Sequence, residues 1–368
     1  MAFALQGIGC AIPATVYDQA EGLSMAKSLC CRTDEQVTWL PTMYQGTGIR
    51  KRHMVLPRAL VDDVIAGRTN SGSVYLPTGE PEDRGPTTGK RMQVYREEAG
   101  RLAGAATAKA LRQAGIAAAE LTHLVTVSCT GFHAPGFDQE LIHELDLPLE
   151  LHRTHVGFMG CHGALNGLRV ARAFAEADPA ARVLLCAVEL CSLHYHYGWD
   201  PGKVVANAIF ADGAAAVVGA ALPKSATSHW RLIASGSRII PGTADAMSWA
   251  IGDHGFEMTL SKQVPGLIHK HLRPWLVEWL ARHDRRLEDI RSWAIHPGGP
   301  RILGAAAEAL GLLPEQTATA RSVFAEYGNM SSPTTLFILE RLRQQHAPRP
   351  CLALGFGPGL AVEAALFE

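Results

Sequence analysis

The chain has 368 residues, of which 47% are hydrophobic and only 19% charged, against roughly 25% charged residues in average soluble domains. Its 34 basic and 35 acidic residues nearly cancel, which argues against non-specific binding to nucleic acids or to membrane surfaces. No apolar run approaches the ~18 residues of a membrane span, no signal peptide is expected, and the eight scattered cysteines indicate a reduced set. We therefore expect a cytoplasmic enzyme with no nucleic-acid partner and no membrane span.

Short apolar strands alternate with Ala- and Leu-rich helical stretches, which is the pattern of an α/β protein. In chain order, the expected elements are a surface loop over Gly67–Gly89, a helix over Lys90–Ala114, strands over Thr122–Ser128 and Glu150–Val156, a helix over Gly163–Ala177, strands over Arg182–Val188, Ala214–Ala221 and Trp230–Ser237, helices over Val264–Arg282, Arg301–Leu310 and Pro333–Arg343, and a strand over Cys351–Phe356. A compositional break at 222–229 divides the chain into two expected halves, 1–225 and 226–368. Each half carries its own strand and helix alternation, which indicates a duplicated architecture.

The first segment that indicates chemistry is Gly157-Phe-Met-Gly-Cys161, between an expected strand and an expected helix. A thiol near a helix N-terminus lies close to unpaired N–H groups and the positive end of the dipole, which lowers its pKa. We therefore expect Cys161 to be a nucleophile. The alternative interpretation is a buried structural cysteine, because free cysteine is among the most buried residue types.

Three further segments accompany this cysteine. His296 ends an apolar strand and is followed by Pro-Gly-Gly-Pro, which places it in the crevice where α/β folds build sites. Asn329 precedes Ser331, Ser332 and a helix that starts at Pro333; by default it is a turn or cap residue. The loop Gly355-Phe-Gly-Pro-Gly lacks the spacing of a nucleotide-phosphate loop, but its backbone can approach a ligand closely.

The order of these residues has one other interpretation. His296 follows Cys161 by 135 residues and Asn329 lies 33 further on, which is also the order in papain-like hydrolases. The papain-type cysteine, however, lies near the mature N-terminus in a C-G-[SA]-C-[WY] setting, whereas 160 residues precede Cys161 here. The context therefore argues against a protease.

The motifs GFMGCHGALNGLRVA, FADGAAAVVG, WAIHPGGP, YGNMSSPT and GFGPG, in this order, resemble those of type III polyketide synthases of the chalcone/stilbene synthase family. The resemblance runs from about Gly7 to the C-terminus and is weakest across 60–95. It implies a thiolase fold, with two duplicated α/β halves that form a five-layered αβαβα core. It also implies a homodimer that acts on acyl-CoA and malonyl-CoA without a cofactor, a metal or a carrier protein.

The resemblance assigns roles to individual residues. Cys161 corresponds to the nucleophile that accepts the starter acyl group, and His296 to the partner that keeps it as thiolate. His296 and Asn329 would donate hydrogen bonds to the thioester oxygen of malonyl-CoA, which stabilises the enolate formed on decarboxylation. Phe210 matches an aromatic gatekeeper between the CoA entrance and the cavity.

The sequence departs from the plant members of the family at several positions. Met258 stands where they have a second gatekeeper Phe, so the passage between the CoA entrance and the cavity should widen. Trp249 stands where they have a small glycine, so the pocket for aromatic starters should narrow. The positions of their CoA-binding basic residues fall near Trp39, Thr42 and Gly46, so Arg50, Arg52 or Arg301 is expected to serve instead. The remaining cavity residues are expected in three loops, at Cys129, Thr130 and Ala134, at Cys191, and at Gly357 and Pro358.

Three small side chains in these loops, Thr130, Ala134 and Cys191, resemble those of bacterial members of the family that take long fatty acyl starters, in which they leave a narrow tunnel for the alkyl chain; the resemblance therefore implies such a tunnel here. A long-chain fatty acyl starter and an alkylpyrone or alkylresorcinol product would follow, because each buried methylene contributes ~0.8 kcal/mol. Two alternatives stay open: a ketoacyl synthase III-like enzyme that stops after one condensation, and a non-enzymatic thiolase-fold scaffold. Fast labelling of Cys161 by iodoacetamide near pH 7 would argue against the scaffold.

Overall fold

The computed structural model describes residues 2–223 and 228–368. Within these residues, nine strands form one mixed sheet in the order β11-β12-β13-β8-β1-β7-β6-β4-β5. Pairing of β1 with β8 joins two groups of strands over three residue pairs, Phe3 with Leu232, Ala4 with Arg231 and Leu5 with Trp230. The sheet therefore consists of an N-terminal and a C-terminal part with a narrow seam between them.

The strands of the N-terminal part are β1 (Ala2–Ala11), β4 (His123–Ser128), β5 (His152–Gly157), β6 (Arg182–Leu190) and β7 (Asp212–Leu222). Those of the C-terminal part are β8 (Trp230–Ile239), β11 (Ser292–Ile295), β12 (Cys351–Gly357) and β13 (Ala361–Phe367). In the first part β7 is antiparallel to both β1 and β6, and β6 is parallel to β4. In the second part β13 is antiparallel to both β8 and β12, and β12 is parallel to β11. The two parts repeat one topology, and β5 is the strand of the first part that the second part lacks.

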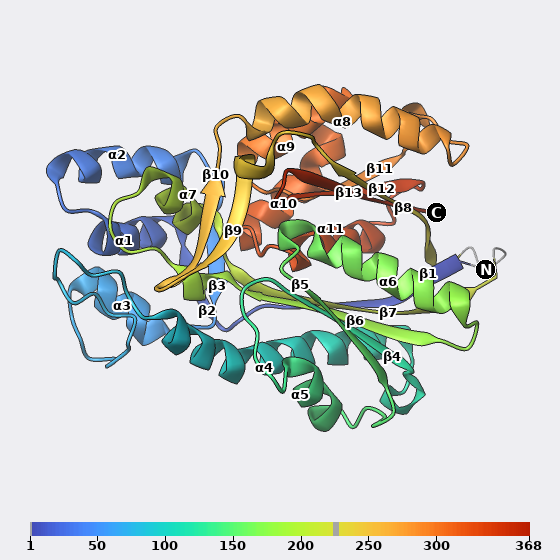
Figure 1. Cartoon of the computed structure of the whole chain (residues 1–368), viewed down its shortest axis with the longest axis horizontal. Helices are drawn as coiled ribbons and strands as arrows, with labels where there is room; N and C mark the ends of the chain where they lie inside the picture. The colour runs from blue at the N-terminus through green and yellow to red at the C-terminus, as the bar shows by residue number, and fades with distance from the viewer. Residues whose placement is uncertain (1, 224–227) are drawn as a thin grey trace.

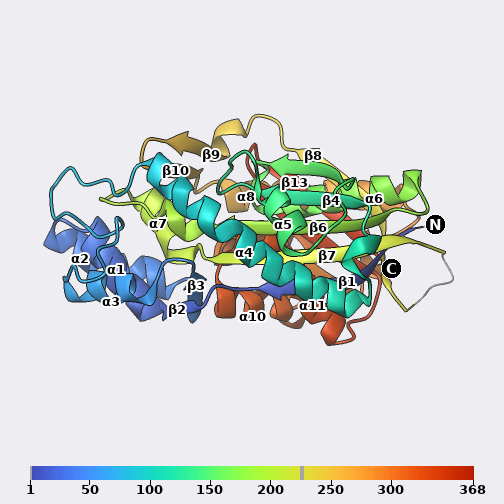
Figure 2. The same ribbon diagram turned by 90° about the horizontal axis from the view of Figure 1, so that it is seen from below.

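Helices cover these two parts in layers (Figure 1). The outer helices of the N-terminal part are α4 (Thr88–Ala114) and α5 (Phe137–Glu144), and those of the C-terminal part are α8 (Val264–Ala281) and α9 (Pro300–Leu310). Between the two groups of strands lie α6 (Gly163–Ala177) and α11 (Pro333–Gln344), and α6 packs on strands of both groups. Seen from below, α4 runs across the strands of its own part (Figure 2). The expected duplicated α/β architecture with five layers is confirmed.

The central helices pack closely because small and apolar side chains line both of their faces. Along α6, every residue from Gly163 to Leu168 is buried, and along α11 every residue from Pro333 to Glu340 is buried. Such helices lose contact with water on nearly all sides, which stabilises them through burial rather than through intrinsic propensity. The residues that immediately precede α6 and α11 are therefore held by rigid elements.

A smaller subregion at the N-terminal end of α4 is built from elements that the sequence pattern did not predict. It contains α1 (Gln19–Cys30), α2 (Asp34–Gln45), α3 (Arg58–Ala66) and α7 (Pro201–Ile209), with the two-stranded sheet of β2 (Thr15–Asp18) and β3 (Lys51–Met54) and the hairpin of β9 (Met247–Gly252) and β10 (Gly255–Leu260). The other unpredicted elements are α10 (Ala318–Tyr327), α5 and the strand β1.

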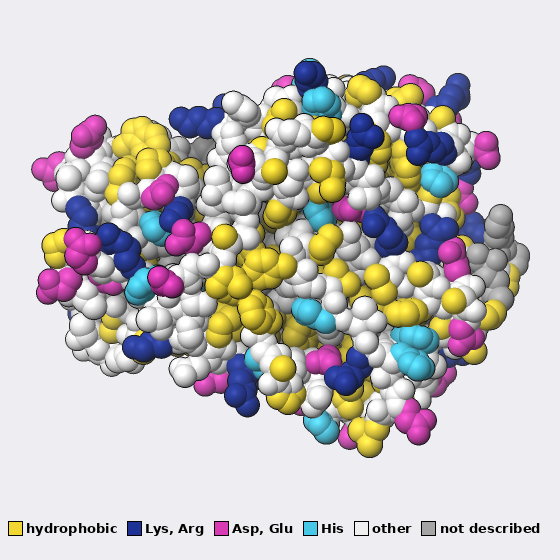
Figure 3. Space-filling view, viewed as in Figure 1, with side chains coloured by type: hydrophobic (Ala, Val, Ile, Leu, Met, Phe, Trp, Pro, Cys, Tyr) yellow, Lys and Arg dark blue, Asp and Glu magenta, His cyan; other side chains and the backbone are white. Residues whose placement is uncertain are grey.

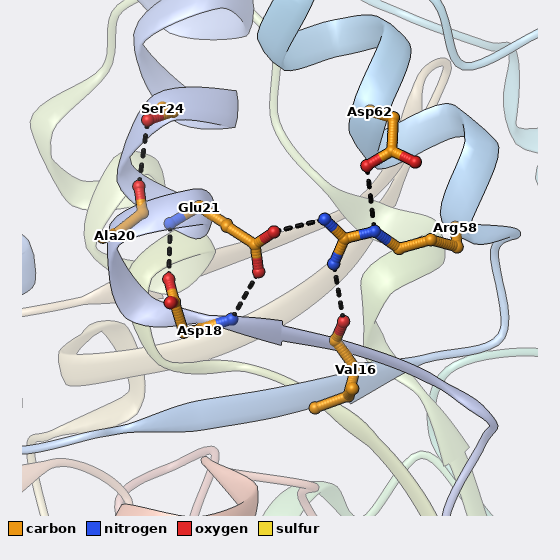
Figure 4. A network of polar contacts seen from close by, with 7 residues as sticks. All are labelled: Val16, Asp18, Ala20, Glu21, Ser24, Arg58 and Asp62. Carbon is orange, nitrogen blue, oxygen red and sulfur yellow. Dashed lines mark hydrogen bonds and ion pairs between the residues drawn. The ribbon is translucent and has the colours of Figure 1, made fainter.

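A surface network ties this subregion together (Figure 4). Asp18 and Glu21 form a capping box at the start of α1, with N···O distances of 2.8 and 2.9 Å. Arg58 of α3 contacts the Glu21 carboxylate and donates hydrogen bonds to Asp62 and to the carbonyl of Val16 on β2. The charged groups are satisfied by one another, so the network links α1, α3 and β2.

The predicted strands and helices are confirmed with shifts of one or two residues at their ends. The helix expected over Lys90–Ala114 begins two residues earlier, and the strand expected over Glu150–Val156 begins two residues later. The proposed boundary between residues 225 and 226 lies outside the described residues. Among those that are described, no helix is both long and apolar enough to cross a membrane.

Candidate active site

Cys161 lies on a tight turn between β5 and the central helix α6. Phe158 and Gly160 have positive φ angles of 59° and 74°, and a single 3-10 turn over Gly160–His162 leads into α6 at Gly163. The expected placement of the thiol just before a helix is present. The expected lowering of its pKa is wrong for this structure: burial of the thiol raises its pKa to about 11, and hydrogen bonds from Ser331 and Asn329 only partly oppose this effect.

Asn329 reaches Cys161 from the C-terminal half. Its Nδ2 lies 3.9 Å from the Cys161 Sγ and 3.4 Å from the carbonyl oxygen of Gly298, and the residue is almost completely buried. The orientation of the amide is fixed because its Oδ1 accepts a 2.8 Å hydrogen bond from the Ser331 N–H. Asn329 is therefore more than a helix cap, since its amide lies beside the sulfur, with Nδ2 at 3.9 Å and Oδ1 at 4.0 Å.

His296 lies directly after β11, as expected, and is fully buried. Neither of its ring nitrogens has a hydrogen-bond partner among the described residues, so no hydrogen bond to the thiol of Cys161 is present. Burial, with a smaller contribution from the neighbouring His162, lowers the pKa of His296 to about 3. At neutral pH these two shifts favour a neutral thiol and a neutral imidazole over the thiolate that the resemblance implies.

His162 fills the space behind these residues. Its Nδ1 shares a 2.7 Å hydrogen bond with the Asn166 Oδ1, and its ring lies against Gly357 of the GFGPG loop. A Cβ at Gly357 would approach the His162 Cδ2 to 2.4 Å, so only glycine fits there. Gly357 therefore accommodates His162 rather than lining the substrate cavity, whereas Pro358 does line it.

We call the small space beside the nucleophile the reaction cavity; its volume is about 30 Å³. It is lined by Cys129, Thr130, Gly160, Cys161, Cys191, Phe210, Met247, Ser248, Trp249, Met258, Ser331 and Pro358. The Trp249 Nε1 donates a 2.7 Å hydrogen bond to the carbonyl of Cys129, which holds the indole across the cavity. This placement agrees with the expectation that Trp249 narrows the pocket.

A buried carboxylate supports the wall of the reaction cavity. Glu189, at the end of β6, accepts hydrogen bonds from the Thr130 Oγ1 at 2.7 Å, the Ser332 Oγ at 2.6 Å and the Cys129 N–H at 2.9 Å. Burial nevertheless raises its pKa. Sequence analysis missed Glu189, although an acidic residue within an apolar strand is a visible signal.

A larger space, the side chamber, adjoins the reaction cavity and has a volume of about 310 Å³. The two spaces share Cys191, Phe210, Trp249 and Met258, and the side chamber is further lined by Arg84, Ser192, His194, Tyr195, His196, Lys203, Ala206, Asn207, Asp253, His254, Phe256 and Glu257. His194, also missed, stacks on Phe256 with ring centroids 4.2 Å apart, and its Nδ1 accepts the Phe256 N–H at 2.9 Å. Burial lowers the pKa of His194 to about 3, so its imidazole is a neutral part of the chamber wall.

On the other side of α7 lies a cleft of about 510 Å³, which we call the entrance cleft. It is lined by Trp39, Thr42, Met43, Gly46, Thr47, Pro201, Gly202, Val205, Ile209, Leu260, Ser261, Lys262, Val264, Pro265, Gly298, Gly299, Pro300, Arg301 and Ile302. Its inner end reaches Gly298, the residue whose carbonyl contacts Asn329. Lys262 and Arg301 supply positive charge; of the two, only Arg301 was predicted.

Three predicted substrate contacts differ in the structure. Arg52 is fully buried and donates to backbone carbonyls, so it is closed to CoA. Arg50 is exposed beside Glu326 at 3.6 Å and lines none of the cavities described above. Ala134 is exposed, and a tunnel formed by Thr130, Ala134 and Cys191 together is therefore wrong, because only the first and last of these face the reaction cavity.

A cysteine ahead of one central helix and an asparagine ahead of its topological counterpart, meeting between two repeated α/β halves, define the class of thiolase-fold condensing enzymes. The comparisons with known proteins agree. The sequence model of "Chalcone and stilbene synthases, N-terminal domain" matches residues 2–223, and that of the C-terminal domain matches residues 231–368. The chain therefore belongs to the chalcone and stilbene synthase family and is a type III polyketide synthase.

Individual relatives cover nearly the whole chain. The "Alpha-pyrone synthesis polyketide synthase-like Pks18" of Mycobacterium tuberculosis is 31% identical over 99% of this chain and 90% of its own length. The 1,3,6,8-tetrahydroxynaphthalene synthase of Streptomyces peucetius is 29% identical over 97% of this chain and 91% of its own. Among solved structures, PKS-I from the brown alga Ectocarpus siliculosus superposes with a TM-score of 0.89 at 31% identity, over 100% of this chain and 98% of that one.

Proposed function

We propose that this type III polyketide synthase loads an acyl-CoA starter on Cys161 and extends it with malonyl-CoA. In the loading step the sulfur attacks the thioester carbonyl, a new thioester forms and the bond to CoA breaks. The proton of the Cys161 thiol ends on the sulfur of the departing CoA, and we assign the relay of this proton to His296. The observation that carries this proposal is the contact between Cys161, which lines the reaction cavity, and Asn329, which comes from the other half.

In the extension step we assign His296 and Asn329 to the thioester oxygen of malonyl-CoA. Loss of CO₂ leaves an enolate whose negative charge lies on that oxygen, and two aimed N–H donors stabilise it. A neutral imidazole suits this role because it retains one N–H and does not need to lose a charge. The unpartnered nitrogens of His296 support this assignment, since a buried polar group without a partner costs about 1–3 kcal/mol until a ligand supplies one.

The entrance cleft is the proposed CoA site. Lys262 and Arg301 would face the phosphates, Trp39 would offer an apolar surface, and the inner end at Gly298 lies beside the Asn329 amide. The cleft ends at Ile209, and the next residue, Phe210, faces the reaction cavity. The pantetheine arm would therefore pass the end of α7 to reach Cys161.

For the starter we propose a long-chain fatty acyl group, with an alkylpyrone or alkylresorcinol as product. The reaction cavity is too small for such a chain, so it would pass between Cys191 and Met258 into the side chamber, whose inner walls are aromatic. The name of the mycobacterial relative supports an α-pyrone product. This path replaces the tunnel predicted past Ala134.

The open edge of the sheet suggests how two copies assemble. Within the described chain β5 pairs with β4 alone, and an unpaired strand edge invites another strand. Figure 3 shows hydrophobic side chains gathered on this face between the β9–β10 hairpin and β5. Phe132, Phe158 and Met159 are exposed, and the two Phe rings lie 6.2 Å apart. We propose a homodimer through this face; light scattering should give twice 39.5 kDa at micromolar concentration, and a stable monomer would contradict it.

One assay tests the proposed activity. A panel of acyl-CoAs that spans about a tenfold range of acyl chain length, from about two to about twenty carbons, is incubated with malonyl-CoA, and the products are identified by mass. We expect products extended by more than one malonyl unit, with the highest turnover for long acyl chains. Products of a single condensation would favour a ketoacyl synthase III-like enzyme, and a preference for short or aromatic starters would overturn the assigned path through the side chamber.

A further inference from the structure

Arg52 is a buried arginine for which the proposed function gives no role. It lies in β3 and is fully buried, with its guanidinium 4.8 Å from the ring of Tyr17 and 5.9 Å from that of Tyr44. No carboxylate of the described residues forms an ion pair with it, and its Nε and one terminal nitrogen have no hydrogen-bond partner. Burying a charge in this way is costly, so it requires a compensating interaction.

That interaction is with the end of α7. The other terminal nitrogen of Arg52 donates to the carbonyl of Asn207 at 2.6 Å and to that of Phe210 at 3.0 Å. The last carbonyls of a helix lack intrahelical partners and carry the negative end of its dipole, so a guanidinium stabilises them. In a continuing helix the Asn207 carbonyl would accept the N–H of Ala211, but here that N–H donates to the carbonyl of Asn329 at 2.9 Å.

The same junction holds the backbone of Asn329. Its N–H donates to the carbonyl of Ile209 at 2.8 Å, which completes a bridge between Phe210 and Asn329. The preceding residue, Gly328, lies directly over Arg52: its φ is +72°, and a Cβ there would approach the Arg52 Cγ to 2.9 Å. Arg52 therefore contacts both chain segments that meet at the junction, the one with Phe210 and the one with Asn329.

We propose that Arg52 is a positioning residue that fixes the end of α7 and, through it, the aim of the Asn329 amide at the Cys161 sulfur. The inference rests on the proposed role of Asn329 in decarboxylation. It predicts that changing Arg52 impairs the enolate step selectively, because Cys161 is held by a different element, the start of α6. The loading of the starter should be much less affected.

The test uses Arg52→Lys in the full chain, with Arg91→Lys as matched control. Arg91 is also fully buried, lies 5.7 Å from the Tyr75 ring and donates to backbone carbonyls, but not to the end of α7. Malonyl-CoA decarboxylation and acyl loading are each measured per folded protein, with the folded fraction taken from circular dichroism. For Arg52→Lys we expect the decarboxylation kcat to fall at least about tenfold, with the KM for malonyl-CoA and the loading rate within about threefold.

The control should lose stability but keep decarboxylation per folded protein within about threefold of wild type. An equal loss of loading and decarboxylation in Arg52→Lys, or no loss of decarboxylation, would overturn the inference. If that variant does not fold, Gly328→Ala displaces the same contact from the other side; it should show the same selective loss, and intact decarboxylation would overturn the inference. Absence of decarboxylation in the wild-type protein would instead refute the proposed function.

Discussion

The two halves of the molecule share one topology but contribute different chemistry at equivalent places. In the N-terminal half the segment before the central helix α6 carries Cys161; in the C-terminal half the segment before α11 carries Asn329. The strand that precedes the site is β4 in one half and β11 in the other. Cys129 follows β4 and His296 follows β11, and both are buried. The repeated scaffold therefore places these four side chains at two copies of the same pair of positions.

The two halves differ in the hydrogen bonds that these side chains form. Cys129 in the N-terminal half contacts the Glu189 carboxylate and Ser331, so it is part of a completed hydrogen-bond network. His296, its counterpart, has no partner among the described residues. A completed network supports the wall of a cavity, whereas an unpartnered imidazole is available to a ligand. The comparison supports our proposal that the N-terminal half carries the covalent step and the C-terminal half stabilises the charge.

The largest effect is expected from removing the nucleophile of the N-terminal half. Cys161→Ala should abolish polyketide formation and the acyl adduct seen by intact mass, because among the described residues Cys161 is the thiol that contacts the amide of Asn329. Far-ultraviolet circular dichroism checks that the variant is folded. An undiminished adduct would show that another cysteine carries the acyl group, and our assignment of the covalent step to Cys161 would be wrong.

The next effect concerns the C-terminal half. Asn329→Ala removes one of two proposed donors to the enolate oxygen, which typically costs about 10²–10³ in rate. Malonyl-CoA decarboxylation should fall by this factor while starter loading, measured by intact mass, persists. Asn166→Ala is the control, because the amide of Asn166 on α6 forms a hydrogen bond with His162. Comparable loss of loading and decarboxylation in Asn329→Ala would mean that Asn329 is structural.

The pH dependence of alkylation tests the state of the thiol. Only the thiolate reacts, and with a pKa raised to about 11 its fraction grows about tenfold per pH unit below that value. His296, with a pKa lowered to about 3, does not titrate in this range. The rate of iodoacetamide labelling at the Cys161 peptide should therefore rise about 100-fold between pH 7 and pH 9. A plateau below pH 8 would reveal a thiolate–imidazolium pair and reverse our account of the free enzyme.

The smallest expected effect concerns the route of the starter. Cys191→Phe should narrow the connection between the reaction cavity and the side chamber. Losing room for two methylenes costs ~1.6 kcal/mol, about a tenfold loss in kcat/KM for long acyl-CoA relative to short. Ala134→Phe is the matched control, since Ala134 is exposed and the chain length preference should not change. A shift in Ala134→Phe but not in Cys191→Phe would restore the tunnel that the sequence predicted.

Local patterns in the sequence predicted the parts of the site that are themselves local. The Gly-rich turn at Cys161, the strand end at His296 and the helix start after Asn329 each leave a signal within about ten residues. A duplicated α/β architecture was predictable, because strands and helices alternate on both sides of the 222–229 break. Helix α7 and the β9–β10 hairpin were not, although they form the walls between the three cavities.

Properties that depend on burial could not be obtained from the sequence. The thiol of Cys161 has the expected position before a helix, yet desolvation outweighs the helix dipole and raises its pKa. Arg52 lies between Lys51 and His53, in a polar run that is typical of a protein surface, but in the structure its side chain on β3 points toward the end of α7. Ala134 lies four residues from Thr130, but the loop carries it to the surface. Each of these outcomes is set by elements distant in sequence.

Our central claim is that the N-terminal half carries the covalent step and the C-terminal half stabilises the charge. Malonyl-CoA decarboxylation by Cys161→Ala tests this claim most directly. If the C-terminal half generates the enolate with His296 and Asn329, this variant should still convert malonyl-CoA to acetyl-CoA and CO₂ while it forms no acyl adduct and no polyketide. Release of labelled CO₂ measures the first activity, and intact mass the second. Persistent decarboxylation without acylation is the result that our account predicts; loss of decarboxylation together with acylation, in a folded variant, would contradict it.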